Sequence, residues 1–320
     1  PLYEMAVKDA EKGVLERDTA RQDVAFQVFR TYLEVQKSDA RFKAADKAMA
    51  DARENMRLAT VRTAAGVGLR SDELRARTHQ SLAEQQLITA HNNLALTRMQ
   101  LAMLIGLAED QRFDISRLPD SVFVPALNED LIKSALENRI DMKQARIDLE
   151  KSGAAIRLAG SGYFPALDAF ASYQLNSKET PLGDDNNAWT AGISLRWPLF
   201  EGFRSNFERS RATAARSAAL EIMESRARDV RYQLKESFLR RDETGKRLEV
   251  ARHALLDAEE AVRLITKRFE NSLATMAESL DAQSALNQPR TDLIETEAGY
   301  ALAGGRVYYA AGIFLKEMLK

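Results

Sequence analysis

YFPALDAFASYQLNSKETPLGDDNNAWTAGISLRWPLFEG, residues 163–202, is the stretch that decides the fold. Two segments within it alternate apolar and polar side chains, with a polar loop between them. In each segment the apolar positions share one face: Leu167, Ala169, Ala171, Tyr173 and Leu175 in the first, and Trp189, Ala191, Ile193, Leu195 and Trp197 in the second. The opposite face is polar and carries Asp168 and Arg196. This pattern predicts two β-strands in a chain that is otherwise helical in pattern.

Strands of this kind have two interpretations. A strand of a transmembrane β-barrel is roughly ten residues long, with lipid-facing and lumen-facing positions in alternation and aromatics at both interfaces. Tyr173, Trp189 and Trp197 are then lipid-interface aromatics, and Arg196 faces the lumen. An amphipathic hairpin covering a soluble core has the same alternation, and Phe170 on the polar face fits a barrel strand poorly. Alternation by itself leaves both interpretations open.

The composition excludes several classes of function. The 320 residues include 46 basic and 47 acidic side chains, without the basic excess of a nucleic-acid-binding protein. The chain has no cysteine, so it has no disulfide or thiolate chemistry. No apolar run reaches the roughly 18 residues of a membrane-spanning helix. Because the first residue is Pro1 rather than methionine, we expect a mature product or a fragment without its original start.

The region before the strands predicts an antiparallel helical hairpin, from about residue 14 to residue 107. It is broken once, at AAGVGLRSDEL, where Gly66 and Gly68 can end the first helix. Ser71 and Leu74 can begin the second. Each arm has a coiled-coil seam with steps of three and four: Phe42, Ala45, Met49, Ala52, Met56 and Ala59, and then Leu87, Ala90, Leu94, Thr97, Leu101 and Leu104.

A connector and a second helical block complete the pattern. Residues 108–128 lose periodicity and contain Pro119 and Pro125. Asn128 is a predicted N-cap for a helical stretch that breaks near residues 138–141 and leads to the first strand.

After the strands, residues 204–268 predict one long helix. Its seam consists of Leu248, Ala251, Leu255, Ala258, Val262, Ile265 and Phe269. NSLATMAESL breaks this helix, and a return arm follows to Gly312, with a kink expected at Pro289. The tail, residues 313–320, is ambiguous.

The two helical blocks repeat each other at a shift of 206 residues, without a gap. Matching positions include Asp51 and Asp257, Arg57 and Arg263, Arg62 and Arg268, Leu87 and Leu293, and Gly106 and Gly312. PLYE at residues 1–4 also echoes PLFE at residues 198–201, at a different shift. We interpret Pro1 as the last residue of a first strand pair that is missing from this chain.

Membrane physics adds a constraint if the strands cross a bilayer. Neither two strands nor four can close a barrel, because the smallest barrels need about eight. An open sheet edge is not tolerated in hydrocarbon. Several copies of the chain must therefore pool their strands, and the helices below would form a hollow cylinder.

This arrangement resembles the TolC-type outer-membrane efflux proteins. The most specific matches are SLRWPLFEGFRSNFERSRA at residues 194–212 and AGSGYFPALDAFASY at residues 159–173. ENSLATMAESLDAQSAL, residues 270–286, resembles the family's second hairpin turn. The similarity covers essentially the whole chain.

The resemblance implies a mainly helical homotrimer with a twelve-strand transmembrane β-barrel in the Gram-negative outer membrane and an α-helical barrel across the periplasm. It implies a passive exit duct of an efflux or type I secretion system. The implied partners are outer-membrane lipid, a periplasmic adaptor protein and an inner-membrane pump of RND, ABC or MFS type. Five segments are expected: 1–107, first repeat; 108–162, connector and helix; 163–202, strand pair with an extracellular loop; 203–312, second repeat; and 313–320, tail.

The resemblance also assigns site residues. The family's periplasmic constriction falls on Glu278, Asp281 and Phe269, the last usually a tyrosine in a hydrogen-bonded lock. The arginine of that lock falls on Ala274, so the lock is absent here or served by other residues. Asp72, the repeat partner of Glu278, is expected on the outer hairpin. Adaptor contact is expected at the two hairpin turns, on Gly66, Val67, Gly68, Leu69, Ser272, Leu273 and Ala274.

The residues themselves indicate no enzyme, cofactor or metal. No catalytic constellation is present, and His79, His91 and His253 are scattered singly, so each is expected to be solvated. Glu278 and Asp281, three apart on a helix, could also be an ordinary solvated acidic face. The alternative function is a soluble coiled-coil scaffold or tether with a small β cap. The sequence does not name the cargo, the pump or the resting state.

Overall fold

The structure is a computed structural model that describes residues 1–108, 113–116, 125–176 and 186–318. The expected loop between the strands, residues 177–185, and Pro119 of the connector lie outside these ranges. The chain forms two compact units. The first contains Pro1–Arg17 and Ile140–Arg228, and the second contains Asp18–Arg139 and Asp229–Lys320.

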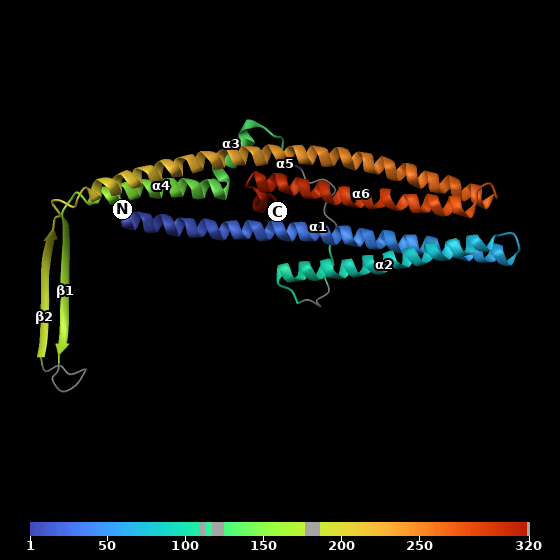
Figure 1. Cartoon of the computed structure of the whole chain (residues 1–320), viewed down its shortest axis with the longest axis horizontal. Coiled ribbons are helices and arrows are strands. Elements are labelled where there is room, and N and C mark those ends of the chain that lie inside the picture. The colour runs from blue at the N-terminus through green and yellow to red at the C-terminus, as the bar shows by residue number, and fades with distance from the viewer. Residues whose placement is uncertain (109–112, 117–124, 177–185, 319–320) are drawn as a thin grey trace. The chain divides into compact units, whose positions relative to one another are not determined.

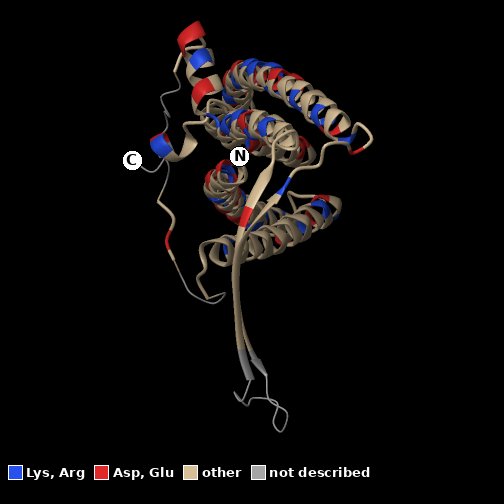
Figure 2. Ribbon diagram, turned by 90° about the vertical axis from the view of Figure 1, so that its left-hand side faces the viewer, with Lys and Arg blue, Asp and Glu red and all other residues tan. Residues whose placement is uncertain are grey.

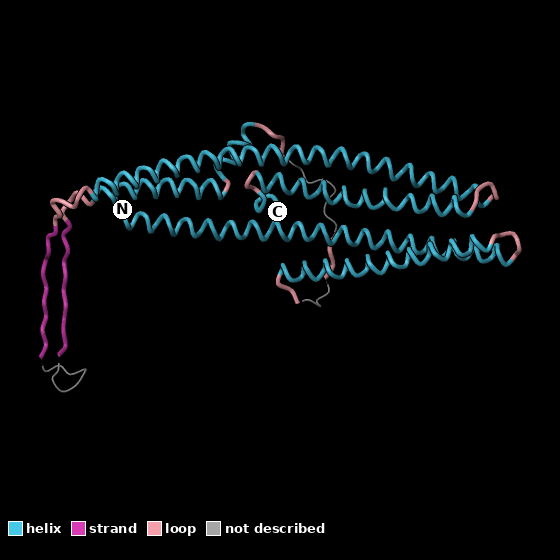
Figure 3. Tube along the Cα trace, in the orientation of Figure 1, coloured by secondary structure: helices cyan, strands magenta, loops and turns pink. Residues whose placement is uncertain are grey.

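The elements follow the predicted order (Figures 1 and 3). They are α1 (Leu2–Ala64), α2 (Arg70–Ile105), α3 (Glu129–Asn138), α4 (Ile140–Ser161), β1 (Ala166–Asn176), β2 (Asn186–Arg196), α5 (Arg204–Glu270), α6 (Met276–Ala310) and α7 (Phe314–Met318). We call residues 65–69, between α1 and α2, the first turn, and residues 271–275, between α5 and α6, the second turn. Among the described residues, no helix combines the length and the apolar character that a membrane span requires.

The two helical hairpins are confirmed, and their seams are buried or half-buried. Met49 and Ala52 of α1 pack on Ala83 and Leu87 of α2. In the second hairpin Leu248, Ala251 and Phe269 are buried positions of the α5 seam. The apolar residues spaced by three and four therefore face neighbouring helices, as their periodicity predicts.

The repeat reappears in the element boundaries. α1 and α5 end 206 positions apart, at Ala64 and Glu270, and α2 and α6 begin 206 positions apart, at Arg70 and Met276. The ends of α2 and α6 correspond too, because Gly106 and Gly312 both adopt left-handed backbone, with φ of 75° and 73°. The same helix-ending geometry is thus used at equivalent positions of both blocks.

The structure also bears on the predicted cap of α3, the predicted start of α2 and the predicted kink in α6. Asn128 caps α3 as expected, accepting a hydrogen bond from the Leu131 N–H at 2.8 Å. α2 begins at Arg70, one residue before the predicted Ser71, after an N-cap residue, Leu69, that makes no side-chain capping bond. α6 continues as one helix through Pro289, and the expected kink stays a prediction.

The predicted start of the first helix at about residue 14 is wrong, since α1 begins at Leu2. Its first turns lack a clear apolar stripe and are paired with α4 by charge instead. The ion pairs join Glu4 to Arg157, Lys8 to Glu150, Asp9 to Lys151 and Lys12 to Asp148. Residues 2–4 are helical whereas Leu199 and Phe200 are not, so the two echoing segments have different backbones.

The tail contributes to an apolar cluster of the second unit. Phe314 of α7 packs with Phe29 and Leu33 of α1 and with Val307 and Tyr308 of α6. A Cβ on Gly305 would lie 2.3 Å from the Phe29 ring, so a glycine is required where α6 passes this ring. The same glycine carries no periodic signal in the sequence.

The two strands pair antiparallel and in register. Leu167 faces Leu195, Ala169 faces Ile193 and Tyr173 faces Trp189, so the apolar positions of both strands share one face. Figure 2 shows few charged residues on these strands compared with the helices. Phe170 on the polar face lies over Gly192, where a Cβ would be 2.8 Å from the ring Cζ. Because Gly192 has no side chain, the Phe170 ring has room on this otherwise polar face of the strand pair.

Candidate functional site at the hairpin turns

The first turn is a tight, glycine-dependent end of α1. Gly66 has a φ of 75°, and its N–H donates to the Thr63 carbonyl at 3.1 Å. The N–H groups of Val67 and Gly68 both donate to the Arg62 carbonyl at 3.0 Å. This is the Schellman arrangement with one added bond, and it leaves Val67 75% exposed at the end of the hairpin.

The second turn follows the same path with different residues. Ser272 takes the left-handed position with a φ of 57°, and the Leu273 N–H donates to the Arg268 carbonyl at 2.7 Å. Leu273, the repeat partner of Val67, is 68% exposed. Both turns thus present an exposed apolar side chain at the same place, among the residues predicted for adaptor contact.

Glu278 helps to cap the N-terminus of α6, a role that the sequence analysis did not predict. Its Oε2 accepts hydrogen bonds from the Thr275 N–H at 2.7 Å and from the Thr275 Oγ1 at 2.9 Å. Thr275 Oγ1 in turn accepts from the Glu278 N–H at 3.2 Å, which completes a capping box. The two bonds from Thr275 lower the pKa of the Glu278 carboxyl group. The spacing of Thr275 and Glu278 was the available signal.

Asp281 lies one turn further along α6. Glu278 and Asp281 are both exposed, so neither is committed to the core of this chain. Because Glu278 is bonded to Thr275, Asp281 is the freer of the two carboxylates.

Phe269 belongs to an apolar cluster to which four helices contribute. It is 8% exposed and packs with Ala59 of α1, Ala76 of α2, and Met276 and Leu280 of α6. Ala274, where the resemblance would place an arginine, is packed against the same cluster. The guanidinium of Arg62 lies over the Phe269 ring, 4.5 Å from its centroid, a contact that the sequence analysis did not predict.

Further polar contacts join α1 to α6 along the second unit. The Asn55 side-chain amide donates to the Gln283 side-chain oxygen, and Asn55 is buried. Arg41 pairs with Glu295, and Tyr309 donates to Asp23 at 2.6 Å. Of these contacts only the one made by Asn55 involves a buried residue, so loss of Gln283 would leave a buried amide without this partner, which is costly.

The predicted lipid-interface aromatics are exposed. Tyr173 and Trp189 stand opposite each other across the strand pair, and Trp189 is 78% exposed. Trp197 follows the last residue of β2 and is also exposed. Strand pairing thus brings Tyr173 and Trp189 together, whereas Trp197 lies beyond the other end of β2.

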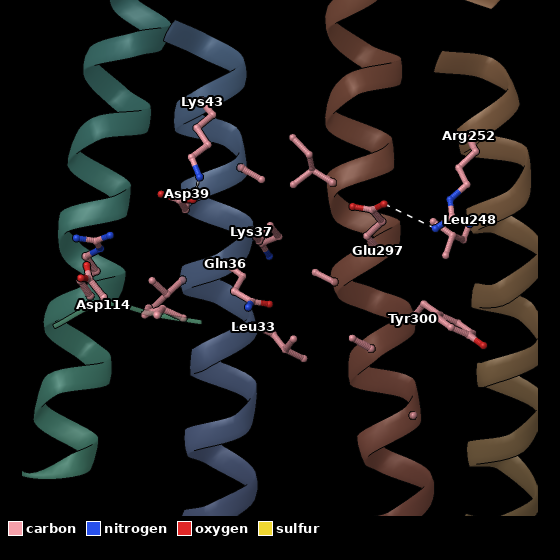
Figure 4. A pocket seen from close by; sticks show the side chains of 18 of the residues that line it. Leu33, Gln36, Lys37, Asp39, Lys43, Asp114, Leu248, Arg252, Glu297 and Tyr300 are labelled. Atoms are coloured by element: carbon pink, nitrogen blue, oxygen red, sulfur yellow. Dashed lines mark ion pairs between the residues drawn. The ribbon is translucent and has the colours of Figure 1, made fainter. Parts of the chain in front are cut away.

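A cavity of about 610 Å³ lies among α1, α2, α5, α6 and the connector in the second unit (Figure 4). Its wall mixes charged and apolar side chains, and the charges are largely paired. Arg252 lies 3.9 Å from Glu297, and Lys43 lies 2.7 Å from Asp39. None of the predicted site residues lines this cavity.

His79 and His91 lie on α2, and His253 lies on α5. In the part of the chain that the structure describes, no three His, Asp or Glu side chains group closely enough to hold a metal ion. His79 is not solvated as expected, because its Nδ1 is buried without a hydrogen-bond partner among the described residues. Burial lowers the pKa of this imidazole. His91 packs edge-on against Phe42, with ring centroids 5.8 Å apart.

The amino-acid sequence of the chain is similar to known proteins over most of its length. It matches the model of the family described as outer membrane efflux protein at residues 2–107 and 131–312. It is 24% identical over 242 residues to the outer membrane protein TolC of Vibrio cholerae, covering 74% of this chain and 54% of that protein. It is 27% identical over 274 residues to the cobalt-zinc-cadmium resistance protein CzcC of Cupriavidus metallidurans, covering 84% and 63%. The chain spans between about half and two thirds of these relatives.

Solved structures share the fold. The outer membrane protein VceC of Vibrio cholerae superposes with a TM-score of 0.79 at 20% identity, covering 97% of this chain and 74% of that one. The open state of the MtrE outer membrane channel of Neisseria gonorrhoeae gives a TM-score of 0.81 at 20% identity, covering 98% and 71%. The predicted combination of helical hairpins and a strand pair is therefore confirmed.

Proposed function

Because the chain belongs to the outer membrane efflux protein family, we propose that it forms the outer-membrane channel of a tripartite efflux or type I secretion system. Its relatives are named outer membrane proteins, and the predicted family and outer-membrane localisation are confirmed. In the proposed role the protein is a passive duct rather than an enzyme. An inner-membrane pump of RND, ABC or MFS type supplies the energy, and a periplasmic adaptor joins pump and duct.

The observation that carries this proposal is the exposed apolar face of the strand pair. Leu167, Ile193 and Leu195 are 69%, 74% and 68% exposed. An isolated two-stranded hairpin is only marginally stable in water, and the unpaired backbone groups at its strand edges are not tolerated in the hydrocarbon core of a membrane. Lipid against this face and neighbouring strands at both edges would satisfy both requirements. Three copies, each with a further strand pair, would supply the twelve strands of the proposed barrel.

The strand pair also supplies the test. We expect Ile193→Lys to abolish membrane insertion and the heat-resistant oligomer of the full-length protein in detergent. A lysine on the lipid face costs about 2–4 kcal/mol at the midplane of the bilayer. Ser194→Lys, the next residue on the opposite face, is the matched control and should be tolerated. Equal behaviour of both variants, or a monomer soluble without detergent, would support the scaffold alternative instead.

We place adaptor contact at the two turns, where Val67 and Leu273 support it. Both side chains are largely exposed at repeat-equivalent positions, so a partner could use similar pockets for both turns. Replacing either with glutamate should weaken crosslinking to the adaptor.

We place the constriction at Glu278, Asp281 and Phe269. In a homotrimer the two carboxylates would give six acidic groups around one axis, a ring that selects and can hold cations. The capping role of Glu278 refines the test, because Asp281→Asn removes one charge without touching the cap. We expect Asp281→Asn to weaken block by divalent cations in single-channel recordings, and an unchanged block would remove Asp281 from the ring.

The cargo is a separate question. Relatives are named for cobalt-zinc-cadmium resistance, pyoverdine export and fusaric acid resistance. Those names describe different cargoes, so membership of the family does not by itself assign a cargo to this chain. The genes beside the one that encodes this chain would identify its pump and adaptor.

A further inference from the structure

The strand pair joins the helices at a junction that carries exposed aromatic side chains. We call this group the junction collar, and its members are 56–77% exposed: Phe164, Trp197, Phe200, Phe203 and Phe207. Phe164 precedes β1, and the other four lie between the end of β2 and the first turn of α5. Exposed apolar groups gathered in this way mark a surface that contacts another molecule or a membrane.

The backbone of the collar is strained where two of its rings meet. Phe203 has left-handed backbone with a φ of 65°, which is unusual for a bulky residue. Its ring packs edge-on against Phe200, with ring centroids 5.8 Å apart, and both rings stay exposed. Strain of this kind gathers at functional sites.

The approach to β1 is attached to the start of α5. The Tyr163 hydroxyl donates a hydrogen bond to the Asn206 side-chain oxygen. A Cβ on Gly162 would lie 3.1 Å from the Ser205 Oγ, so the chain passes close to α5 before it enters the strand. Both ends of the strand pair therefore meet at the collar.

The first turns of α5 add positive charge beside the collar. Arg204 and Arg211 lie three residues before and four residues after Phe207, so these three exposed side chains share one face of the helix. Between Glu208 and Glu221, α5 has three arginines and no acidic residue. Arg204 pairs with Glu208 at 2.8 Å, an exposed pair of small energetic value, whereas Arg211 has no ion pair among the described residues.

A lipid surface fits both parts of this site. Aromatic side chains favour the boundary between hydrocarbon and water, and arginine binds phosphate through charge-assisted hydrogen bonds. The headgroup region is about 5–8 Å thick on each side of the hydrocarbon core. From Arg204 to Arg211 the helix rises about 10 Å. With the collar at the edge of the hydrocarbon, the two arginines are at the depth of the phosphate groups.

We propose that Arg204 and Arg211 bind the phosphate groups of anionic glycerophospholipids, while the junction collar sets the depth of the chain in the membrane. This inference rests on the proposed function, because it requires the strand pair to lie in a bilayer. The site acts at the leaflet from which α5 emerges. It gives the protein a preference among lipids that an apolar strand face does not provide.

Quenching of tryptophan fluorescence by brominated lipids measures this preference. The full-length protein is reconstituted into mixed vesicles of phosphatidylglycerol and phosphatidylcholine, with bromine on one lipid or on the other. Trp189 lies towards the other end of β2, so Trp189→Phe is used as the background and Trp197 reports on the junction. The ratio of quenching by the two lipids gives the preference for the anionic headgroup.

We expect Arg211→Gln to reduce the preference for phosphatidylglycerol about 5-fold, the effect of one positive charge at an anionic surface. The double variant with Arg204→Gln should reduce it further. Arg209→Gln is the matched control, because Arg209 is exposed two residues away on the opposite side of the helix. Arg226→Gln removes an exposed arginine about 22 Å beyond Arg211 along α5. Both controls should leave the preference unchanged.

Phe203→Asn separates the collar from the arginines. Asparagine adopts left-handed backbone more readily than phenylalanine, so this variant removes the ring without adding strain. We expect weaker quenching of Trp197 by both lipids, because the junction lies less deeply in the bilayer. The ratio between the two lipids should stay the same, since both arginines are kept.

The outcomes separate this inference from the proposed function. Equal losses of preference in Arg209→Gln and Arg211→Gln, or no loss in Arg211→Gln, would overturn the headgroup site. Equal quenching by both lipids in the unmodified arginine background would also overturn it, and the proposed function would stand. Absence of quenching by either lipid would mean that protein covers the collar, which contradicts the inference. The proposed function fails as well only when the protein also stays outside the vesicles.

Discussion

The two turns follow one backbone path but stabilise it with different chemistry. At the left-handed position the first turn has Gly66, with a φ of 75°, and the second has Ser272, with a φ of 57°. At the helix N-cap the first turn has Leu69, without a side-chain bond, and the second has Thr275 in a capping box. The first turn is therefore relaxed in backbone and uncapped, whereas the second is strained and capped. A repeated path does not require repeated interactions.

The largest effect is expected at Gly68, where the first turn touches α1. Gly68→Ala would force a Cβ to within 3.0 Å of the backbone and Cβ of Arg62. We expect a loss of roughly 1–3 kcal/mol of local stability, as for other overpacked sites. Exchange protection of residues 62–70 measures it. Ala274→Gly, at the equivalent position of the second turn, is the control and should change little; equal effects would remove this difference between the turns.

The next largest effect is expected at the cap of α6. Thr275→Ala removes the hydroxyl that accepts from the Glu278 N–H, and the usual cost is about 1 kcal/mol. Exchange protection of the first turn of α6 should fall accordingly. Leu69→Ala removes no capping bond from α2, so a similar loss there would contradict the contrast between the two N-caps.

A smaller effect of opposite sign is expected at the left-handed position. Ser272→Gly should raise local stability by about 0.5–1 kcal/mol because glycine adopts positive φ without strain. The reverse exchange, Gly66→Ser, should lower the stability of the first turn by a similar amount. Protection factors measured at both turns give both values, and a loss of stability in Ser272→Gly would show that its bond with Arg62 outweighs the strain.

The smallest effect is a dependence on pH. The hydrogen bonds from Thr275 lower the pKa of Glu278, so the charged form is favoured in the folded turn. The resulting stabilisation is present above the ordinary carboxyl pKa of about 4.3 and is lost as pH falls through the lower folded value. Protection factors at the second turn should therefore decline below about pH 4. Glu278→Gln should remove this decline; a decline that persists would assign it to another group.

Much of the fold follows from local pattern. Alternation fixed the strand faces, steps of three and four fixed the seams, and the shift of 206 residues placed equivalent helix ends. The start of α1 could not be predicted in this way, because its first turns pair with α4 through charges that have no periodic signature. The capping role of Glu278 was readable from its spacing to Thr275, since a capping box is a local motif.

By itself the sequence determined the family, the order of the elements, the face of each strand and the positions of both turns, because each depends on residues close together in the chain. Tertiary structure alone decided that Arg62 meets Phe269, that Gly305 passes the Phe29 ring and that Phe170 lies over Gly192. In each case the two partners lie on different elements. Their contact depends on how those elements pack, and periodicity within one element carries no information about its partner.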